Sequence, residues 1–152
     1  MRSGKSGNNR EDPFDLQRFL KAQERIYDQA LSELKTGEKR SHWMWYIFPQ
    51  IDGLGFSSTT KHYSIKSMEE ARAYLDHPVL GKRLIECTET VLAISGKSVS
   101  RIFGYPDDLK FKSSMTLFAE VTGSDSSFGR AIEQFYNGRR DEKTLALLRK
   151  GL

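Results

Sequence analysis

Long apolar runs are missing from this sequence of 152 residues. No stretch of 18 apolar residues occurs, which argues against a membrane-spanning helix. The opening segment MRSGKSGNNR has no apolar centre, so it does not resemble a secretory signal. Cysteine occurs once, at Cys87, which excludes an internal disulfide and favours a reducing, cytoplasmic location.

Motifs for metals and phosphate loops are absent as well. The three histidines, His42, His62 and His77, stand far apart, and none has a ligand partner at i+3 or i+4. Neither GxxxxGK[ST] nor GxGxxG occurs, so the sequence predicts no metal and no cofactor. Cys87 falls on the apolar face of a predicted helix, which indicates a small buried hydrophobe rather than a nucleophile.

The basic charge is concentrated at one end. Of the net charge of +4, three charges belong to Arg2, Lys5 and Arg10, in a segment without acids. Nucleic-acid-binding domains usually carry a basic stripe on their folded surface, so this pattern argues against nucleic acid as a partner. We expect a disordered basic tail over residues 1–11 and a single helical domain over residues 12–152.

Helical periodicity dominates the rest of the chain. Apolar residues recur at helical spacing from Leu16 to Leu34, and Gly37 stands where that helix should end. The predicted class is all-α: a compact single-domain bundle of seven to eight short helices. A small hairpin around residues 50–66 is possible, and no alternating pattern supports it. The remaining helices are predicted within residues 41–47, 67–76, 78–95, 98–103, 106–121, 125–137 and 141–150. Ser67 and Glu70 form a capping box at the start of the second of these.

Both tryptophans lie in the stretch HWMWYIFPQ, which the glycine-rich segment IDGLGF follows. This stretch fits either a short helix capped by Ser41 or a buried strand. One short element cannot bury every ring, so we expect half of them in the core and half along a ligand site. Candidate binding residues are Trp43, Trp45 and Tyr46 as a stacking wall, with Gly53 and Gly55 allowing close approach of the backbone. The alternative is that all the rings anchor the core.

A second dense motif, PDDLKFKSSMTLF, supplies polar groups. Asp107 shares a helical face with Phe111, Ser114 and Phe118, and Lys110 lies beside it. We consider Asp107 and Asp108 as candidate catalytic residues, acting as a general base or holding ribose hydroxyls. Lys110 would meet a phosphate, and Ser113 and Ser114 would contribute hydroxyls. The alternative is that the two acids favour the helix N-terminus and that Asp108 pairs with Lys112.

The motifs HWMWYIFPQ, HPVLG and PDDxKxxSSMTLF resemble those of the bacterial DUF1810 family over most of the chain. That resemblance implies a compact, mainly helical fold and no settled activity. The segment HPVLGKRLIECTETVLAIS is also similar, more weakly, to the NADAR family, which acts on NAD- and ADP-ribose-type molecules. The chain departs from that family where it has Ser95 in place of an acid and Phe103-Gly104 in place of Trp-Gly. The second resemblance implies a nucleotide-like ligand.

Two functions follow from these patterns. The first is binding or hydrolysis of an ADP-ribose- or nucleotide-like small molecule, between the aromatic stretch and the helix that begins at Asp107. The second is a non-catalytic protein-interaction module, with Phe56 in the glycine-rich segment as a contact and the basic tail as an accessory arm.

Overall fold

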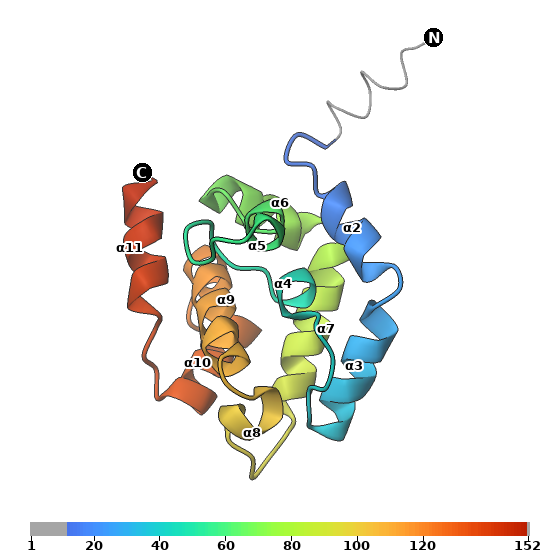
Figure 1. Ribbon diagram of the computed structural model, residues 1–152. Helices are drawn as coiled ribbons and strands as arrows, with labels where there is room; N and C mark the ends of the chain where they lie inside the picture. The colour runs from blue at the N-terminus through green and yellow to red at the C-terminus, as the bar shows by residue number, and fades with distance from the viewer. Residues whose placement is uncertain (1–11, 152) are drawn as a thin grey trace.

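A computed structural model describes residues 12–151, which fold into ten helices without a strand (Figure 1). The helices surround one continuous apolar core, and the predicted all-α class is confirmed. The expected tail over residues 1–11 lies outside the described residues. The helices are α2 (Gln17–Gln23), α3 (Tyr27–Thr36), α4 (Met44–Ile47), α5 (Ser58–His62), α6 (Met68–Asp76), α7 (Leu80–Leu92), α8 (Val99–Phe103), α9 (Asp107–Thr122), α10 (Ser127–Tyr136) and α11 (Glu142–Lys150).

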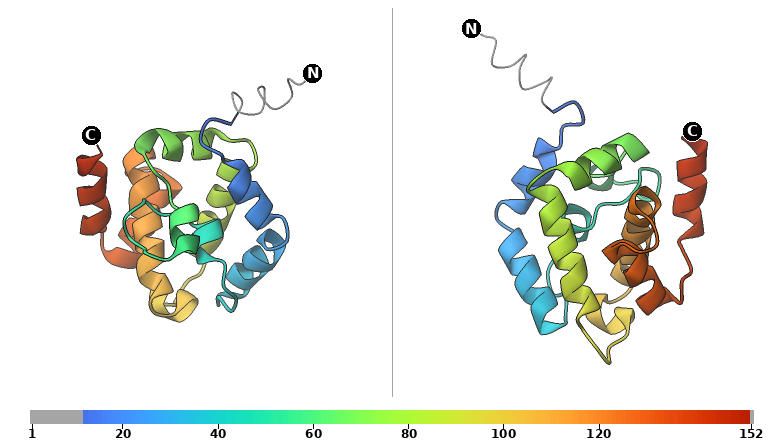
Figure 2. Two further views of the ribbon diagram at one scale, coloured as in Figure 1. Left: turned by 45° about the horizontal axis from the view of Figure 1, so that its top comes forward. Right: turned by 180° about the vertical axis from the view of Figure 1, so that it is seen from behind.

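Helix α9 is the centre of the fold because its sequence is apolar or small on nearly every side. Residues 113 to 119 are all buried, and helices α4, α6, α8, α10 and α11 pack against α9. Seen from behind, α7 runs beside α10, and α3 covers another side of α7 (Figure 2). None of the helices in residues 12–151 has the length and apolar character that crossing a membrane requires.

Local signals set several helix ends as the sequence predicts. Gly37 ends α3 with a φ of 84°, which is the left-handed conformation that glycine adopts without strain. Ser67 caps α6, because its hydroxyl accepts a hydrogen bond of 3.1 Å from the Glu70 N–H. His77 also caps a helix start: its Nδ1 accepts from the N–H groups of Val79 and Leu80.

The first predicted helix is split into α2 and α3, and tertiary contacts explain the break. Gln23 is buried, and its Nε2 donates to the Tyr46 carbonyl at 2.8 Å and the Tyr74 hydroxyl at 3.0 Å. These bonds direct α2 toward α4, whereas α3 packs on α7. The chain turns between the two at Glu24 to Ile26, which a regular apolar spacing does not reveal.

The hairpin expected as an option around residues 50–66 is wrong. Ile51 and Ile65 form one isolated parallel bridge. The chain between them makes the short helix α5, which begins after Ser57, whose hydroxyl accepts from the Thr60 N–H at 3.1 Å. This extra helix and the split of the first helix account for ten helices rather than the expected seven to eight.

Arg18 fastens α2 to the chain that follows α5. Its guanidinium donates to the carbonyl oxygens of His62 at 2.7 Å and Ser64 at 2.9 Å. It also forms an ion pair of 2.6 Å with Glu70, and the two side chains are only 8% and 2% exposed. The same guanidinium donates to two carbonyls in the turn before α2, so one side chain joins three segments.

Candidate functional site

The two tryptophans of the HWMWYIFPQ stretch have different surroundings. Trp43 is fully buried, and its ring packs against Phe48 with centroids 6.2 Å apart. Its Nε1 donates to the carboxylate of Glu33 at 2.9 Å. Trp43 is therefore a core residue with a satisfied polar atom, as buried tryptophans usually are.

Glu33 organises the segment that leads into the aromatic stretch. Besides Trp43, its carboxylate accepts from the N–H groups of Arg40 and Ser41 and from the Ser41 hydroxyl. Burial works to raise the pKa of Glu33, but hydrogen bonds, first that of Ser41, outweigh it and lower the pKa to about 2. Ser41 thus serves Glu33 and not, as predicted, the start of α4, which has no side-chain cap.

Trp45, the second residue of α4, is only half-buried. Its Nε1 is closed off from water and has no hydrogen-bond partner among residues 12–151. Gln50 is 2% exposed, and its Nε2 is likewise closed off from water without a hydrogen-bond partner among the described residues. A buried donor without a partner costs roughly 1–3 kcal/mol, and both of these residues line one cleft.

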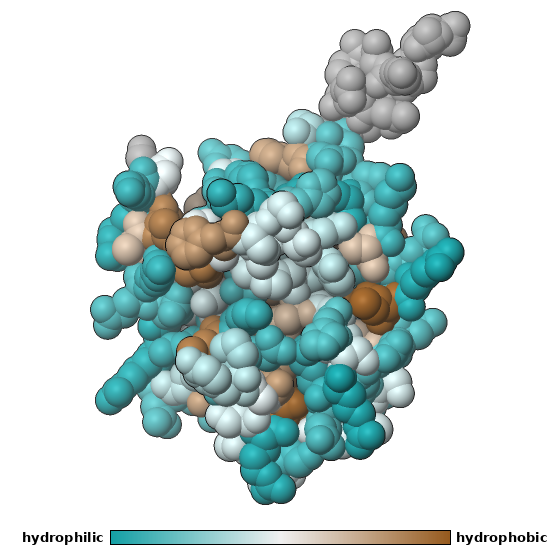
Figure 3. Space-filling view, in the orientation of Figure 1, coloured by the Kyte–Doolittle hydropathy of each residue, from teal (hydrophilic) through white to brown (hydrophobic). Residues whose placement is uncertain are grey.

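This cleft lies between the end of the aromatic stretch, the glycine-rich loop and α9, and has a volume of about 400 Å³. Among the described residues that line it there is no acid, whereas Lys110 and Lys143 supply two cations. Phe56 stands at its rim and is 79% exposed. Hydrophobic residues gather on this face where the loop lies beside α11 (Figure 3). The remaining lining residues are Leu54, Gly55, Ser57, Thr60, Pro106, Leu109 and Ser113.

A smaller cavity of about 150 Å³ adjoins the cleft and shares Trp45 and Lys110 with it. Asp107 lines this cavity, and its carboxylate forms ion pairs with Lys39 at 2.7 Å and with Lys110 at 3.5 Å. The Lys39 side chain is 6% exposed, and its Nζ lies 5.0 Å from the centroid of the Trp43 ring. The pairing with Asp107 compensates the charge of this enclosed lysine.

Comparison with known proteins identifies the family. The family model described as "Protein of unknown function (DUF1810)" matches residues 13–148. The chain belongs to the DUF1810 family. The crystal structure of the conserved hypothetical protein Rv1873 from Mycobacterium tuberculosis is 51% identical, with a TM-score of 0.89 over 91% of this chain and 99% of that one. A search of curated proteins finds no match.

Two of the DUF1810 motifs, HWMWYIFPQ and PDDLKFKSSMTLF, meet at the cleft and the small cavity. Ligand contact at these positions stays a prediction, but their placement is clear. Of the predicted site residues, Trp45, Gly55, Lys110 and Ser113 line the cleft; Trp43, Tyr46 and Asp107 line the small cavity; Gly53, Asp108 and Ser114 line neither.

The three that line neither cavity have other environments. Asp108 is buried and accepts a hydrogen bond of 2.8 Å from the Ser100 hydroxyl, so it supports α8 and does not pair with Lys112 as the alternative proposed. Ser114 lies on the fully buried face of α9, where its hydroxyl has no partner among the described residues. Gly53 has a φ of 110°, and a Cβ there would stand 3.0 Å from the Leu147 side chain.

Gln50 and Lys143 are among the lining residues that the sequence did not single out. Gln50 lies within the aromatic motif, and a polar side chain after so many apolar ones was the signal that could have identified it. Lys143 reaches the cleft from α11, and nothing in its own segment indicates this. Ser113, which was singled out, also connects α9 to that helix, because its hydroxyl donates to Asp141 at 3.2 Å.

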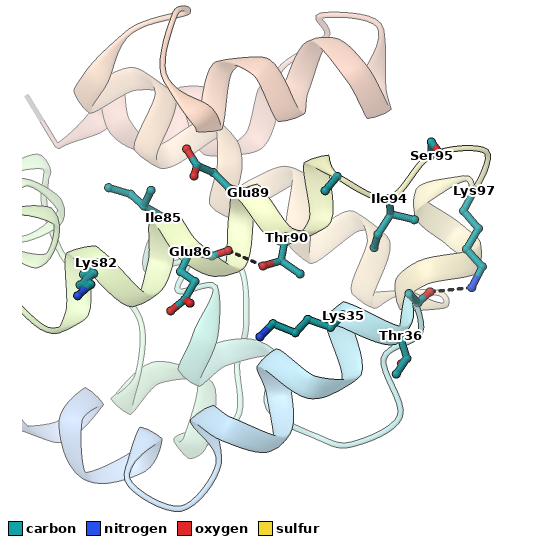
Figure 4. Close-up of a pocket in the computed structure, with 12 residues that line it drawn as sticks. Lys35, Thr36, Lys82, Ile85, Glu86, Glu89, Thr90, Ile94, Ser95 and Lys97 are labelled. Atoms are coloured by element: carbon teal, nitrogen blue, oxygen red, sulfur yellow. Dashed lines mark hydrogen bonds between the residues drawn. The ribbon is translucent and has the colours of Figure 1, made fainter.

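A larger groove of about 920 Å³ runs between α3 and α7 (Figure 4). Glu86 points from α7 toward α3, where it accepts a hydrogen bond of 2.5 Å from Tyr27. Lys97 donates to the Gly37 carbonyl at 2.8 Å. Glu86 and Lys97 of this groove therefore have partners within the protein, unlike the two donors of the cleft.

The segment that resembles the NADAR family forms α7 and borders this groove rather than the cleft. Neither of the comparisons that match concerns NADAR, so that similarity stays a prediction. Cys87 lies on the inner face of the same helix and is fully buried. Burial raises the pKa of its thiol to about 12, which fits the expected role as a small hydrophobe.

Proposed function

We propose that the cleft binds a small, anionic, nucleotide-like molecule. This proposal rests on two buried donors, Trp45 Nε1 and Gln50 Nε2, which have no hydrogen-bond partner among residues 12–151. The N–H of the neighbouring Trp43, by contrast, is bonded to Glu33. Natural proteins pair most buried polar atoms. A ligand that accepts from these two atoms would satisfy them.

The charge of the cleft supports an anion. Lys110 and Lys143 are its only charged lining residues within the part of the chain described. Lysine is a common phosphate ligand, binding as a point charge. Lys110 can turn to a phosphate without leaving Asp107 unpaired, because Lys39 remains 2.7 Å from that carboxylate.

The aromatic residues support a ligand with a flat ring. Trp45 forms one wall of the cleft, and Phe56 stands at the rim with most of its ring in solvent. Stacking of a base on an aromatic side chain is worth roughly 1–3 kcal/mol. Asp107, in the adjoining cavity, would hold ribose hydroxyls. Because both its oxygens face lysines, we propose binding rather than hydrolysis.

Thermal unfolding in the presence of ADP-ribose, NAD and nucleoside monophosphates at millimolar concentration tests the proposal. Binding to the folded state raises the midpoint by several degrees. Lys143→Ala should weaken binding about tenfold, the value of one charge-assisted hydrogen bond. Lys82→Ala, in the groove beside α7, is the matched control and should leave binding unchanged. No shift with any of these ligands would contradict the proposal.

One observation favours the alternative of a protein-interaction module. Three of the most exposed large apolar side chains gather at the cleft: Phe56 and Leu109 line it, and Tyr105 precedes Pro106, which also lines it. Exposed apolar groups that cluster are typical of binding surfaces. If Phe56→Ser abolishes capture of a protein partner while nucleotides fail to stabilise the wild type, the interaction module is the better account.

A further inference from the structure

We propose that Lys39 sets the affinity of the cleft for the phosphate of its ligand, by neutralising Asp107 and so leaving Lys110 available to the anion. Lys39 does not line the cleft, so it is a positioning residue that acts through the other two side chains. The inference rests on the proposed function, because it concerns how strongly that site would hold a phosphate. It follows from the contacts and the exposure of these three charged groups.

Lys110 lies between Asp107 and the cleft. It lines both the cleft and the small cavity, whereas Asp107 and Lys39 line only the small cavity. Its Nζ stands 3.5 Å from the carboxylate of Asp107, farther than in a charge-assisted hydrogen bond, which measures about 2.7–2.9 Å. The side chain is also 34% exposed. Lys110 is therefore loosely held and can turn toward a ligand in the cleft.

Lys39, by contrast, is held in place. Its Nζ lies 2.7 Å from the other oxygen of Asp107 and donates to the Ser41 carbonyl. The same Nζ lies 5.0 Å from the centroid of the buried Trp43 ring, and the side chain is 6% exposed. The backbone N–H of Lys39 donates to the Ile102 carbonyl at 2.7 Å. With these partners Lys39 remains the counterion of Asp107 when the second lysine turns away.

The balance of charge at this place decides what an anion meets. One acid and two lysines leave one positive charge over, and Lys110 carries it beside the cleft. Without Lys39, a phosphate would have to compete for Lys110 with the carboxylate of Asp107. That carboxylate would also repel the phosphate, because the small cavity adjoins the cleft and charges at short range interact strongly where little water separates them. Loss of Lys39 therefore acts on the phosphate and not on the base.

The ratio of the affinities for adenosine monophosphate and adenosine measures the contribution of the phosphate, because base and ribose are common to both. NMR titration of the full chain should show this ratio falling about tenfold in Lys39→Met. A loss of packing around Lys39 would weaken both ligands alike and leave the ratio unchanged. Lys35→Met removes an exposed lysine from α3 and is the control for net charge, so its ratio should equal that of the wild type.

A double variant separates loss of the counterion from loss of the side chain. Lys39→Met/Asp107→Asn removes the lysine and its acid together, so Lys110 again carries an uncompensated charge, and the ratio should return to within about twofold of the wild type. Should Lys39→Met not fold, Lys39→Gln gives the same test, because it keeps a donor for Asp107 and removes the charge.

Three results would overturn the inference. They are a wild-type ratio in Lys39→Met or Lys39→Gln, a ratio that stays low in the folded double variant, and a wild type that binds adenosine monophosphate no more tightly than adenosine. None of these decides the proposed function, which fails only if ADP-ribose, NAD and nucleoside monophosphates all leave the wild type unchanged.

Discussion

Trp43 and Trp45 stand two positions apart and belong to two different environments. Trp43 is enclosed, and its N–H is bonded to Glu33, whose carboxylate also holds the preceding segment. Trp45 is half-buried, and its N–H has no partner among the described residues. This short segment therefore combines a buried tryptophan whose N–H is bonded with a half-buried tryptophan whose N–H has no partner among the described residues.

The comparison predicts that stability and the proposed ligand binding depend on different residues of a single motif. Residues on the Trp43 side should be sensitive in unfolding experiments, because they are buried and mutually bonded. Residues on the Trp45 side should be tolerant in those experiments and sensitive in ligand binding. Measurements on matched substitutions test this distinction.

The largest expected effect concerns the tryptophans themselves. Trp43→Ala should lower the free energy of unfolding by roughly 3–5 kcal/mol, as large truncations in cores do. Trp45→Ala should cost no more than about 2 kcal/mol, because less of its surface is removed from water. Urea denaturation measures both. Equal losses would show that the two rings contribute to the core alike.

The second effect is a pH dependence on the Trp43 side. The pKa of Glu33 is about 2 in the folded protein against 4.5 as its ordinary value, so folding favours the ionised carboxylate. The stabilisation, roughly 3 kcal/mol, is complete above about pH 5 and is lost as the pH falls toward 2.

Glu33→Gln should therefore flatten the fall in unfolding free energy between pH 5 and pH 2.5. Glu24→Gln, at an exposed position, is the control and should follow the wild-type profile. Parallel profiles for wild type and Glu33→Gln would refute the assignment of that stabilisation to Glu33.

The third comparison sets an enclosed lysine against an exposed one. Lys39→Met breaks an ion pair whose lysine is 6% exposed and should cost about 1.5–3 kcal/mol. Lys143→Met should change stability by less than about 0.5 kcal/mol, as substitutions at exposed positions usually do. Thermal unfolding of both variants checks this. A large loss of stability in Lys143→Met would show that the packing of α11 depends on that charge.

Removing only the indole N–H gives the most diagnostic comparison of the two tryptophans. Trp45→Phe removes a donor that makes no bond within residues 12–151, so its cost should stay within about 1 kcal/mol. Trp43→Phe should cost more, because it deprives Glu33 of one donor. Chemical denaturation distinguishes the two, and a larger loss at Trp45 would indicate a bonded N–H in solution.

Much of the fold follows from local sequence. Helix class, the cap at Ser67 and the end at Gly37 depend on a few neighbouring residues, and the structure confirms them. The break between α2 and α3 was missed because it depends on where Gln23 finds partners, 23 and 51 positions further along the chain. The local spacing of apolar residues does not reveal such long-range contacts.

For the candidate site, the structure shows where the predicted residues lie and does not test whether they bind a ligand. The excess of aromatic residues predicted that the HWMWYIFPQ stretch is only partly core, and Trp43 is buried whereas Trp45 is half-buried. That Trp45 forms the wall of a ligand site stays a prediction. Asp107 and Asp108 differ because the Ser100 hydroxyl, in another helix, donates a hydrogen bond to Asp108. The sequence around the two acids does not reveal this contact. Lys143 lies at the cleft because of how α11 packs, and the residues near Lys143 in the sequence do not predict that packing.

The Arg18 cluster has a consequence for the kinetics of folding. Its partners His62, Ser64 and Glu70 lie 44, 46 and 52 positions away, so the guanidinium bonds can form only after three segments have come together. Because loop closure must precede such long-range contacts, we expect these bonds to form late, after the transition state. Arg18→Ala should consequently accelerate unfolding far more than it slows folding, which makes this cluster a determinant of how long the native chain persists.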